Sequence, residues 1–194
     1  FCGATGEIKD VKLVLVLAEP GTPNDEEKER WKLLSKQDPD KILEEHNNYV
    51  TFECDKNSFQ CEIREIVKLC FPPPMDFREA KKKVWITEAV LCSVPGKKST
   101  GPMPEEVEKK CRERYLEKQY EKFKKAYWVA VGRKAERRLK ILDIKPEQYT
   151  FIYHPTYYLN YKRNIDKAEE LKLKLKKDFE KFINNKEKGV QIER

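Results

Sequence analysis

Four short apolar runs stand out along the chain, at residues 12–18, 84–91, 127–131 and 149–153. Each is rich in valine, isoleucine and aromatic residues, and each is apolar at nearly every position rather than at alternate ones. Such continuous runs are typical of strands that are covered on both faces, as in a parallel sheet. We therefore predict four buried strands.

Segments with helical spacing separate these runs. Residues 59–70 place apolar side chains on one helical face, and so do residues 105–124 and 166–185. Shorter helices are expected after Gly21 and after Gly132. The inward-facing residues of the first and last helices are Phe59, Ile63, Ile66, Val67 and Cys70, and Leu171, Leu175, Phe179 and Phe182. Alternation of strand and helix predicts an α/β fold, a three-layer α/β/α sandwich around a central four-stranded parallel sheet.

Each apolar run ends in polar or unusual residues. Glu19, Glu88, Gly132 and His154 all stand at or just beyond the carboxyl end of a predicted strand. In open α/β sheets, ligands bind in the crevice outside these ends. The sequence therefore predicts one site to which all four strands contribute.

Length and charge narrow the class of protein. The 194 residues suit a single domain spanning residues 1–194, which we expect to be a monomer. A net charge of +7 favours nucleic acid or another polyanion as partner, with a merely solubilising surface as the alternative. No apolar stretch is long enough to span a membrane and no signal peptide is evident, so we expect a cytoplasmic protein without a membrane partner.

The six cysteines are the remaining source of chemistry. In a reducing compartment, cysteines are metal ligands or small buried apolar residues more often than disulfides. Both uses remain open for this chain on composition alone.

The order of motifs along residues 12–160 resembles the uracil-DNA glycosylase superfamily, most closely its iron–sulfur-containing branch. The strongest stretch runs from VWITEAVLC through the loop SVPGKKSTGPMPEE and Cys111 to YWVAVGRKA. AEPG at 18–21 resembles the family's first motif, and YHPTYY at 153–158 its terminal one. This resemblance implies a DNA base-excision glycosylase, which hydrolyses the N-glycosidic bond of a flipped-out damaged or deaminated base.

The resemblance also assigns roles to residues. Glu19 would lie beside the sugar and His154 would face the base oxygen, as the catalytic pair. Phe59 would stack on the base, Glu88 would face its hydrogen-bonding edge, and Ala18 would lie in the base pocket, where the iron–sulfur branch carries a carboxylate. The residues implied to bind DNA are Lys97, Lys98, Ser99, Arg133, Thr156 and Tyr157.

An iron–sulfur cluster follows from the same resemblance. Cys92 and Cys111 match two ligand positions of that branch and Cys2 fits a third, so a 4Fe-4S cluster is expected, with zinc as the alternative. The fourth ligand stays open, among Cys54, Cys61 and Cys70 or upstream of Phe1.

Glu88 departs from the family pattern, because relatives that prefer uracil carry Asn there. An ionised Glu only accepts hydrogen bonds, whereas a protonated one also donates. Plainer roles are open too: a buried ion pair for Glu88, helix capping for Glu19, loop capping for His154, and core packing for Phe59. At the level of function, the alternatives are an inactive DNA-binding module of the same fold and an enzyme acting on free nucleosides.

Overall fold

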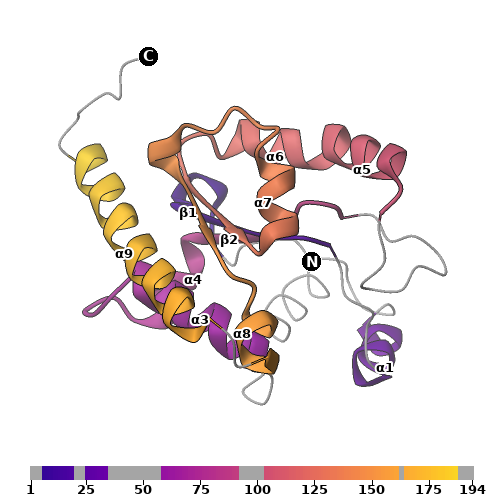
Figure 1. Ribbon diagram of the computed structural model, residues 1–194, viewed down its shortest axis with the longest axis horizontal. Helices are drawn as coiled ribbons and strands as arrows, with labels where there is room; N and C mark the ends of the chain where they lie inside the picture. Colours follow the sequence, from indigo (N-terminus) through magenta and orange to yellow (C-terminus); the bar gives the residue numbers. More distant parts are fainter. Residues whose placement is uncertain (1–5, 20–24, 35–57, 92–102, 162–163, 188–194) are drawn as a thin grey trace.

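The fold is built on a fully parallel four-stranded sheet with helices on both faces (Figure 1). The computed structural model describes residues 6–19, 25–34, 58–91, 103–161 and 164–187. The strands are β1 (Leu13–Leu17), β2 (Val84–Glu88), β3 (Tyr127–Val131) and β4 (Tyr149–Ile152). Their order in the sheet is β2-β1-β3-β4, and every neighbouring pair is parallel. The predicted fold class is confirmed.

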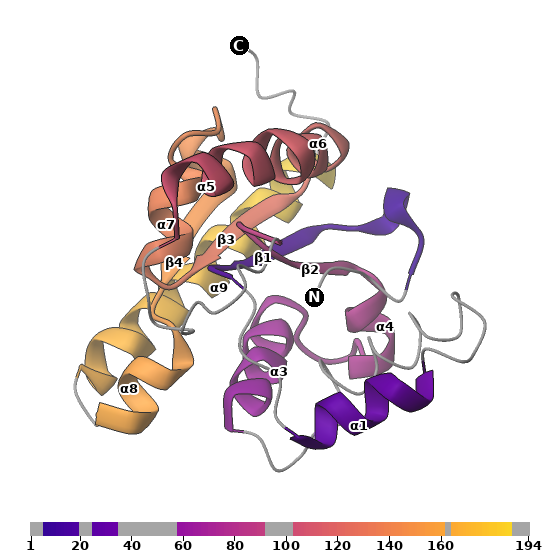
Figure 2. The ribbon, with the colours of Figure 1, turned by 90° about the vertical axis from the view of Figure 1, so that its right-hand side faces the viewer.

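The helices form the outer two layers. One face is covered by α3 (Ser58–Cys70), α4 (Phe77–Lys82) and α9 (Ile165–Glu187), and the other by α5 (Glu105–Cys111), η3 (Arg112–Leu116), α6 (Glu117–Lys122) and α7 (Arg133–Leu139) (Figures 1 and 2). Shorter or peripheral elements are η1 (Ile8–Asp10), α1 (Asp25–Leu34), η4 (Pro146–Gln148) and α8 (Pro155–Tyr161). No helix in the described ranges is long and apolar enough to cross a membrane.

Strand side chains alternate between two buried clusters, which explains why the runs are apolar throughout. In β1, Leu13 and Leu15 face α3 and α9, while Val14 and Val16 face η3, α6 and α7. All four are fully buried. Both faces of the central strands therefore require apolar side chains.

Two amphipathic helices lie where their spacing predicts. α3 buries Ile63, Ile66 and Val67, and α9 buries Leu175 and Phe179 against the same face of the sheet.

Three local features differ from expectation. The helix expected over 105–124 contains a π-helical segment, η3, whose wider turn lets Cys111 and Leu116, five residues apart, both be buried. The second and fourth strands end earlier than expected, at Glu88 and Ile152. α4 and α8 were not predicted, because helices of 6 and 7 residues are too short to show periodicity.

Candidate active site at the carboxyl edge of the sheet

Glu88 is the last residue of β2 and lies in register with Leu17 of β1. Strand alternation places its side chain on the same face as Val84 and Ile86, the face covered by α3. The residue is only 6% exposed. Burial, and to a lesser degree the nearby charge of Glu19, raise the pKa of the Glu88 carboxyl. The acid form of this side chain is therefore favoured beyond what an exposed glutamate would show.

Phe59 and His154 form a stacked pair at the same edge. Their ring centroids are 5.1 Å apart and their planes differ by 20°. Phe59 lies in the first turn of α3, whereas His154 follows β4 by two residues. The fold thus brings together two residues that are far apart in the sequence.

The hydrogen bonds of His154 define its tautomer. The backbone N–H of Thr156 donates to Nδ1 at 3.3 Å, and the Thr156 hydroxyl also contacts Nδ1. Because a backbone N–H only donates, Nδ1 must accept, and the proton of the neutral ring lies on Nε2. Burial lowers the pKa of His154, which favours the neutral ring at neutral pH. Among the described residues, nothing hydrogen-bonds to Nε2.

Gly132 allows the end of β4 to approach the end of β3. Its φ of +94° is a conformation that other residues rarely adopt, and a Cβ at this position would lie 3.0 Å from the Cβ of His154. Its N–H donates to the carbonyl of Ile152 at 2.9 Å. The glycine that the sequence places after the third strand is therefore a steric requirement for His154.

Glu19 lies at the same edge but faces α7. Its carboxylate forms ion pairs of 2.9 Å with both Lys134 and Arg138, and its side chain is 6% exposed. Arg138 also donates to the Ala18 carbonyl at 2.6 Å and to Glu108 of α5 at 2.9 Å. We call these four residues, Glu19, Lys134, Arg138 and Glu108, the Arg138 cluster. It ties the segment after β1 to α7 and α5.

The sequence analysis did not identify Arg138; from this helix it named only Arg133, as a residue implied to bind DNA. The available signal was its spacing: Arg138 stands beside Leu139 and three residues after Ala135, both of which are fully buried. An arginine on such a face needs a buried carboxylate partner.

The order of the strands sets the width of the site. Glu88 ends β2 and His154 follows β4 by two residues, and three spacings of about 4.8 Å put the ends of these two outermost strands about 14 Å apart.

The comparison with protein families covers most of the chain. The family model of the uracil DNA glycosylase superfamily matches residues 10–184, almost the whole chain. The chain belongs to this superfamily. A comparison with curated protein sequences found no match. Membership supports a glycosylase-type function on DNA and hence a hydrolase acting in base excision.

Several predicted site residues of this glycosylase-family chain lie outside the described ranges: Cys2, Cys92, Lys97, Lys98 and Ser99. Of the other predicted DNA contacts, Arg133 begins α7 and Thr156 and Tyr157 lie in α8, and all three are exposed. Tyr157 stacks on Tyr153 at a centroid distance of 5.5 Å. Thr156 contacts Nδ1 of His154, and the Tyr157 N–H donates to the His154 carbonyl at 2.9 Å.

Cys111 has an environment that fits a cluster ligand. It is buried, and its Sγ accepts a hydrogen bond from the backbone N–H of Leu91 at 3.1 Å. Leu91 is the residue before Cys92 in the sequence. Backbone N–H groups donating to sulfur are usual around iron–sulfur clusters. Within the described ranges, no three potential metal ligands gather at one point.

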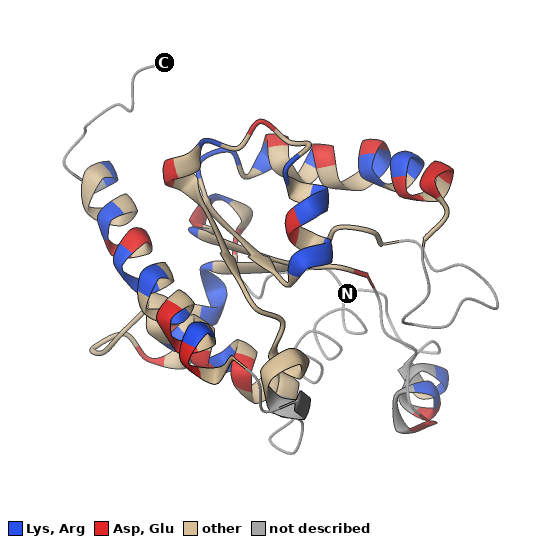
Figure 3. Cartoon of the chain, viewed as in Figure 1, with Lys and Arg blue, Asp and Glu red and all other residues tan. Residues whose placement is uncertain are grey.

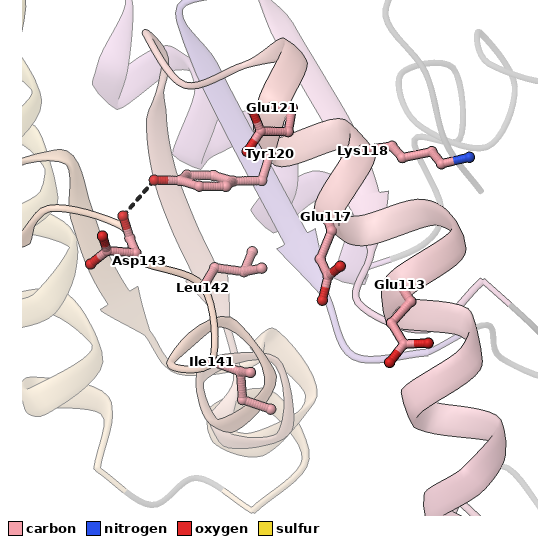
Figure 4. Close-up of a pocket in the computed structure, with 8 residues that line it drawn as sticks. All are labelled: Glu113, Glu117, Lys118, Tyr120, Glu121, Ile141, Leu142 and Asp143. Carbon is pink, nitrogen blue, oxygen red and sulfur yellow. Dashed lines mark hydrogen bonds between the residues drawn. The ribbon is translucent and has the colours of Figure 1, made fainter.

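A cavity of about 420 Å³ lies elsewhere, between α6 and the segment after α7 (Figure 4). Tyr120 crosses it and donates to the carbonyl of Asp143 at 2.5 Å, and four carboxylates line it. None of the candidate site residues lines this cavity, and its acidic lining does not suit DNA.

Proposed function

We propose that this protein removes a deaminated base from DNA by hydrolysing its N-glycosidic bond at the carboxyl edge of the sheet. The observation that carries the proposal is the stacking of Phe59 on His154 at that edge, where Glu88 is also buried at the end of β2. A base inside a duplex cannot reach such a site, so the nucleotide must be flipped out.

His154 would stabilise the departing base. As the glycosidic bond breaks, its electron pair moves onto the ring, and negative charge builds up on a carbonyl oxygen. The Nε2–H of the neutral imidazole is a suitable donor to that oxygen, because Nδ1 is already held by Thr156. Phe59 would pack against the face of the base, as it now packs against the imidazole.

Glu88 would select the base. A protonated carboxyl presents an O–H donor beside a C=O acceptor, the same pair that an Asn amide offers. This pair matches an edge with an N–H beside a C=O, which uracil and hypoxanthine share. Cytosine and adenine present the reverse arrangement there. Because either oxygen of a carboxyl can carry the proton, discrimination against these parent bases requires a neighbouring group that keeps the proton of Glu88 on one oxygen.

Glu19 would act on the sugar side. The sugar becomes cationic as the bond breaks, and a carboxylate nearby stabilises it and orients the attacking water. Lys134 and Arg138 fix the position of this carboxylate. Of the two cations, only Lys134 has a substantially exposed side chain, so DNA phosphates would compete for it first.

We also propose that Cys2, Cys92 and Cys111 hold a 4Fe-4S cluster with a structural role. The environment of Cys111 supports this, and zinc is the alternative. Iron and acid-labile sulfide analysis of protein purified without oxygen tests it. Stoichiometric iron with visible absorbance supports the cluster, and zinc alone refutes it.

A panel of labelled duplexes, each with one uracil, hypoxanthine or undamaged control base, tests the activity. We expect alkali-labile cleavage at uracil or hypoxanthine, and its loss in His154→Ala, with Thr156→Val as a milder change at the same site. Tight binding without cleavage of any duplex would favour the alternative, a DNA-binding module that has lost catalysis. Release from free nucleosides but not from DNA would contradict both.

A further inference from the structure

The amino edge of the sheet, opposite the candidate active site, carries a row of lysines. Lys83 and Lys12 immediately precede β2 and β1, and Lys125 lies two residues before β3. The Lys12 N–H donates to the Lys83 carbonyl at 2.8 Å, and the Tyr127 N–H donates to the Lys12 carbonyl at 2.8 Å. Because β2, β1 and β3 are neighbours, Lys83, Lys12 and Lys125 follow one another along the edge, and we call them the lysine row.

These lysines differ from those on the helices. Lys140 and Lys174, for example, pair with carboxylates one turn away on their own helices, and Figure 3 shows the two charge signs interleaved along α9. In the part of the chain that the structure describes, no carboxylate lies within ion-pair distance of any member of the lysine row.

Lys186, near the end of α9, adds a fourth positive charge. Its Nζ donates to the Lys125 carbonyl, and it lies 4.9 Å from the centroid of the Phe182 ring. Burial, and then the positive charges of Lys12 and Lys125, lower the pKa of Lys186. The charge at this edge is thus concentrated enough to disfavour further positive charge and to attract an anion.

A cavity of about 340 Å³ adjoins the row. Lys12 and Lys83 line it together with Phe71, Met75, Phe179 and Ile183. Its volume suits a small organic group, and apolar walls beside two cations match a flat base attached to a phosphate. Glu180 and Asn184 also line it and offer hydrogen bonds to the polar edge of a base.

We propose that the amino edge is a second nucleic-acid site, which binds single-stranded DNA with one base in the cavity and the adjoining phosphates on the lysine row. Only an unpaired base can enter the cavity, so a single strand is favoured over a duplex. β1 spans five residues, or about 16 Å, so the two edges can hold separate strands. The site does not depend on the base that the carboxyl edge excises.

Salt dependence of binding tests the lysine row. Fluorescence anisotropy would follow an undamaged single-stranded oligonucleotide over a salt series, with wild type, Lys12→Gln/Lys83→Gln, and the control Lys140→Gln/Lys174→Gln, which removes the same charge. A single strand contributes roughly 0.7 to the logarithmic salt slope per phosphate contact, so the slope should fall by about 1.4 in the first variant and stay unchanged in the control. Equal weakening in both variants would mean a general charge effect and would overturn the proposal.

Photocross-linking tests the cavity. A strand containing 4-thiothymidine should cross-link to peptides containing Phe71 and Met75 or Phe179 and Ile183, and an excess of unlabelled single strand should abolish these products. Products confined to the carboxyl edge, or displacement by polyglutamate as effective as by DNA, would refute the assignment. Excision from a lesion duplex is a separate readout, so a chain that binds here but excises nothing would contradict only the proposed function.

Discussion

The two sides of the carboxyl edge use their polar side chains in opposite ways. On the α3 side, Thr156 holds one nitrogen of His154 and orients the other as a donor, and Glu88 is buried in a form that favours its proton. On the α7 side, Glu19 and Glu108 are bound to Arg138 within the protein. On the α3 side a ring nitrogen of His154 is thus oriented as a donor, whereas on the α7 side cations of the protein fix the carboxylates in position.

Removing Arg138 should have the largest effect, because it would leave two carboxylates with little compensation. Arg138 is almost fully buried, with its side chain 3% exposed. We expect Arg138→Met to lower the free energy of unfolding by about 3–5 kcal/mol, as is usual when one partner of a buried ion pair is removed. Urea unfolding measures this. Arg137→Met on the exposed side of α7 is the matched control and should change stability by less than about 0.5 kcal/mol. Equal losses of stability in Arg138→Met and Arg137→Met would mean that the buried ion pairs of Arg138 do not hold the α7 side of the edge together.

Gly132→Ala should have the next largest effect, and this effect should reach both sides of the carboxyl edge. The positive φ alone costs about 1–2 kcal/mol for a residue with a Cβ, and the contact with His154 adds to it. We expect lower stability in urea and a His154 ring signal that shifts in an NMR spectrum. Lys134→Ala, two residues further on in the first turn of α7, controls for a change close to Gly132. A stable variant with an unchanged His154 signal would mean that the glycine is not needed to place the imidazole.

Much of this arrangement follows from the sequence, and the rest depends on contacts that no local pattern encodes. The four apolar runs predicted the strands, and their ends predicted which residues share one edge. The sequence did not predict that Glu19 turns toward α7, because its partner Arg138 lies more than a hundred residues away. Nor did it predict α8, although Pro155 at the first helical position was an available signal. Stacking of Phe59 on His154 depends on the tertiary packing of α3.

Glu88→Gln, on the α3 side, should change the pH dependence of base excision. The raised pKa means that Glu88 is protonated at low pH and ionises as the pH rises through that value. The rate at which the wild type excises a base that presents an N–H beside a C=O, such as uracil, should therefore fall with rising pH. Well above the pKa, the fall should be about tenfold per pH unit. Gln offers the same donor and acceptor at every pH, so the variant should keep its activity over that range. Glu88→Asp retains the titration and serves as the control. Identical profiles for wild type and Glu88→Gln would show that Glu88 does not read the base as an acid.

Lys134→Met should have the smallest effect on stability. It tests the contribution of Lys134 to holding Glu19 separately from that of Arg138. The side chain of Lys134 is 47% exposed, and water screens its ion pair, so we expect stability to change by less than about 1 kcal/mol. Since Arg138 continues to hold Glu19, the variant should fold and retain His154 in place. The variant is informative in kinetic assays of excision. If Glu19 acts on the sugar, removing one of the two cations that pair with Glu19 should change kcat, while the KM for a lesion duplex stays within about twofold of the wild-type value. A rise in KM alone would instead assign Lys134 to phosphate binding and leave Glu19 with a purely structural role on the α7 side.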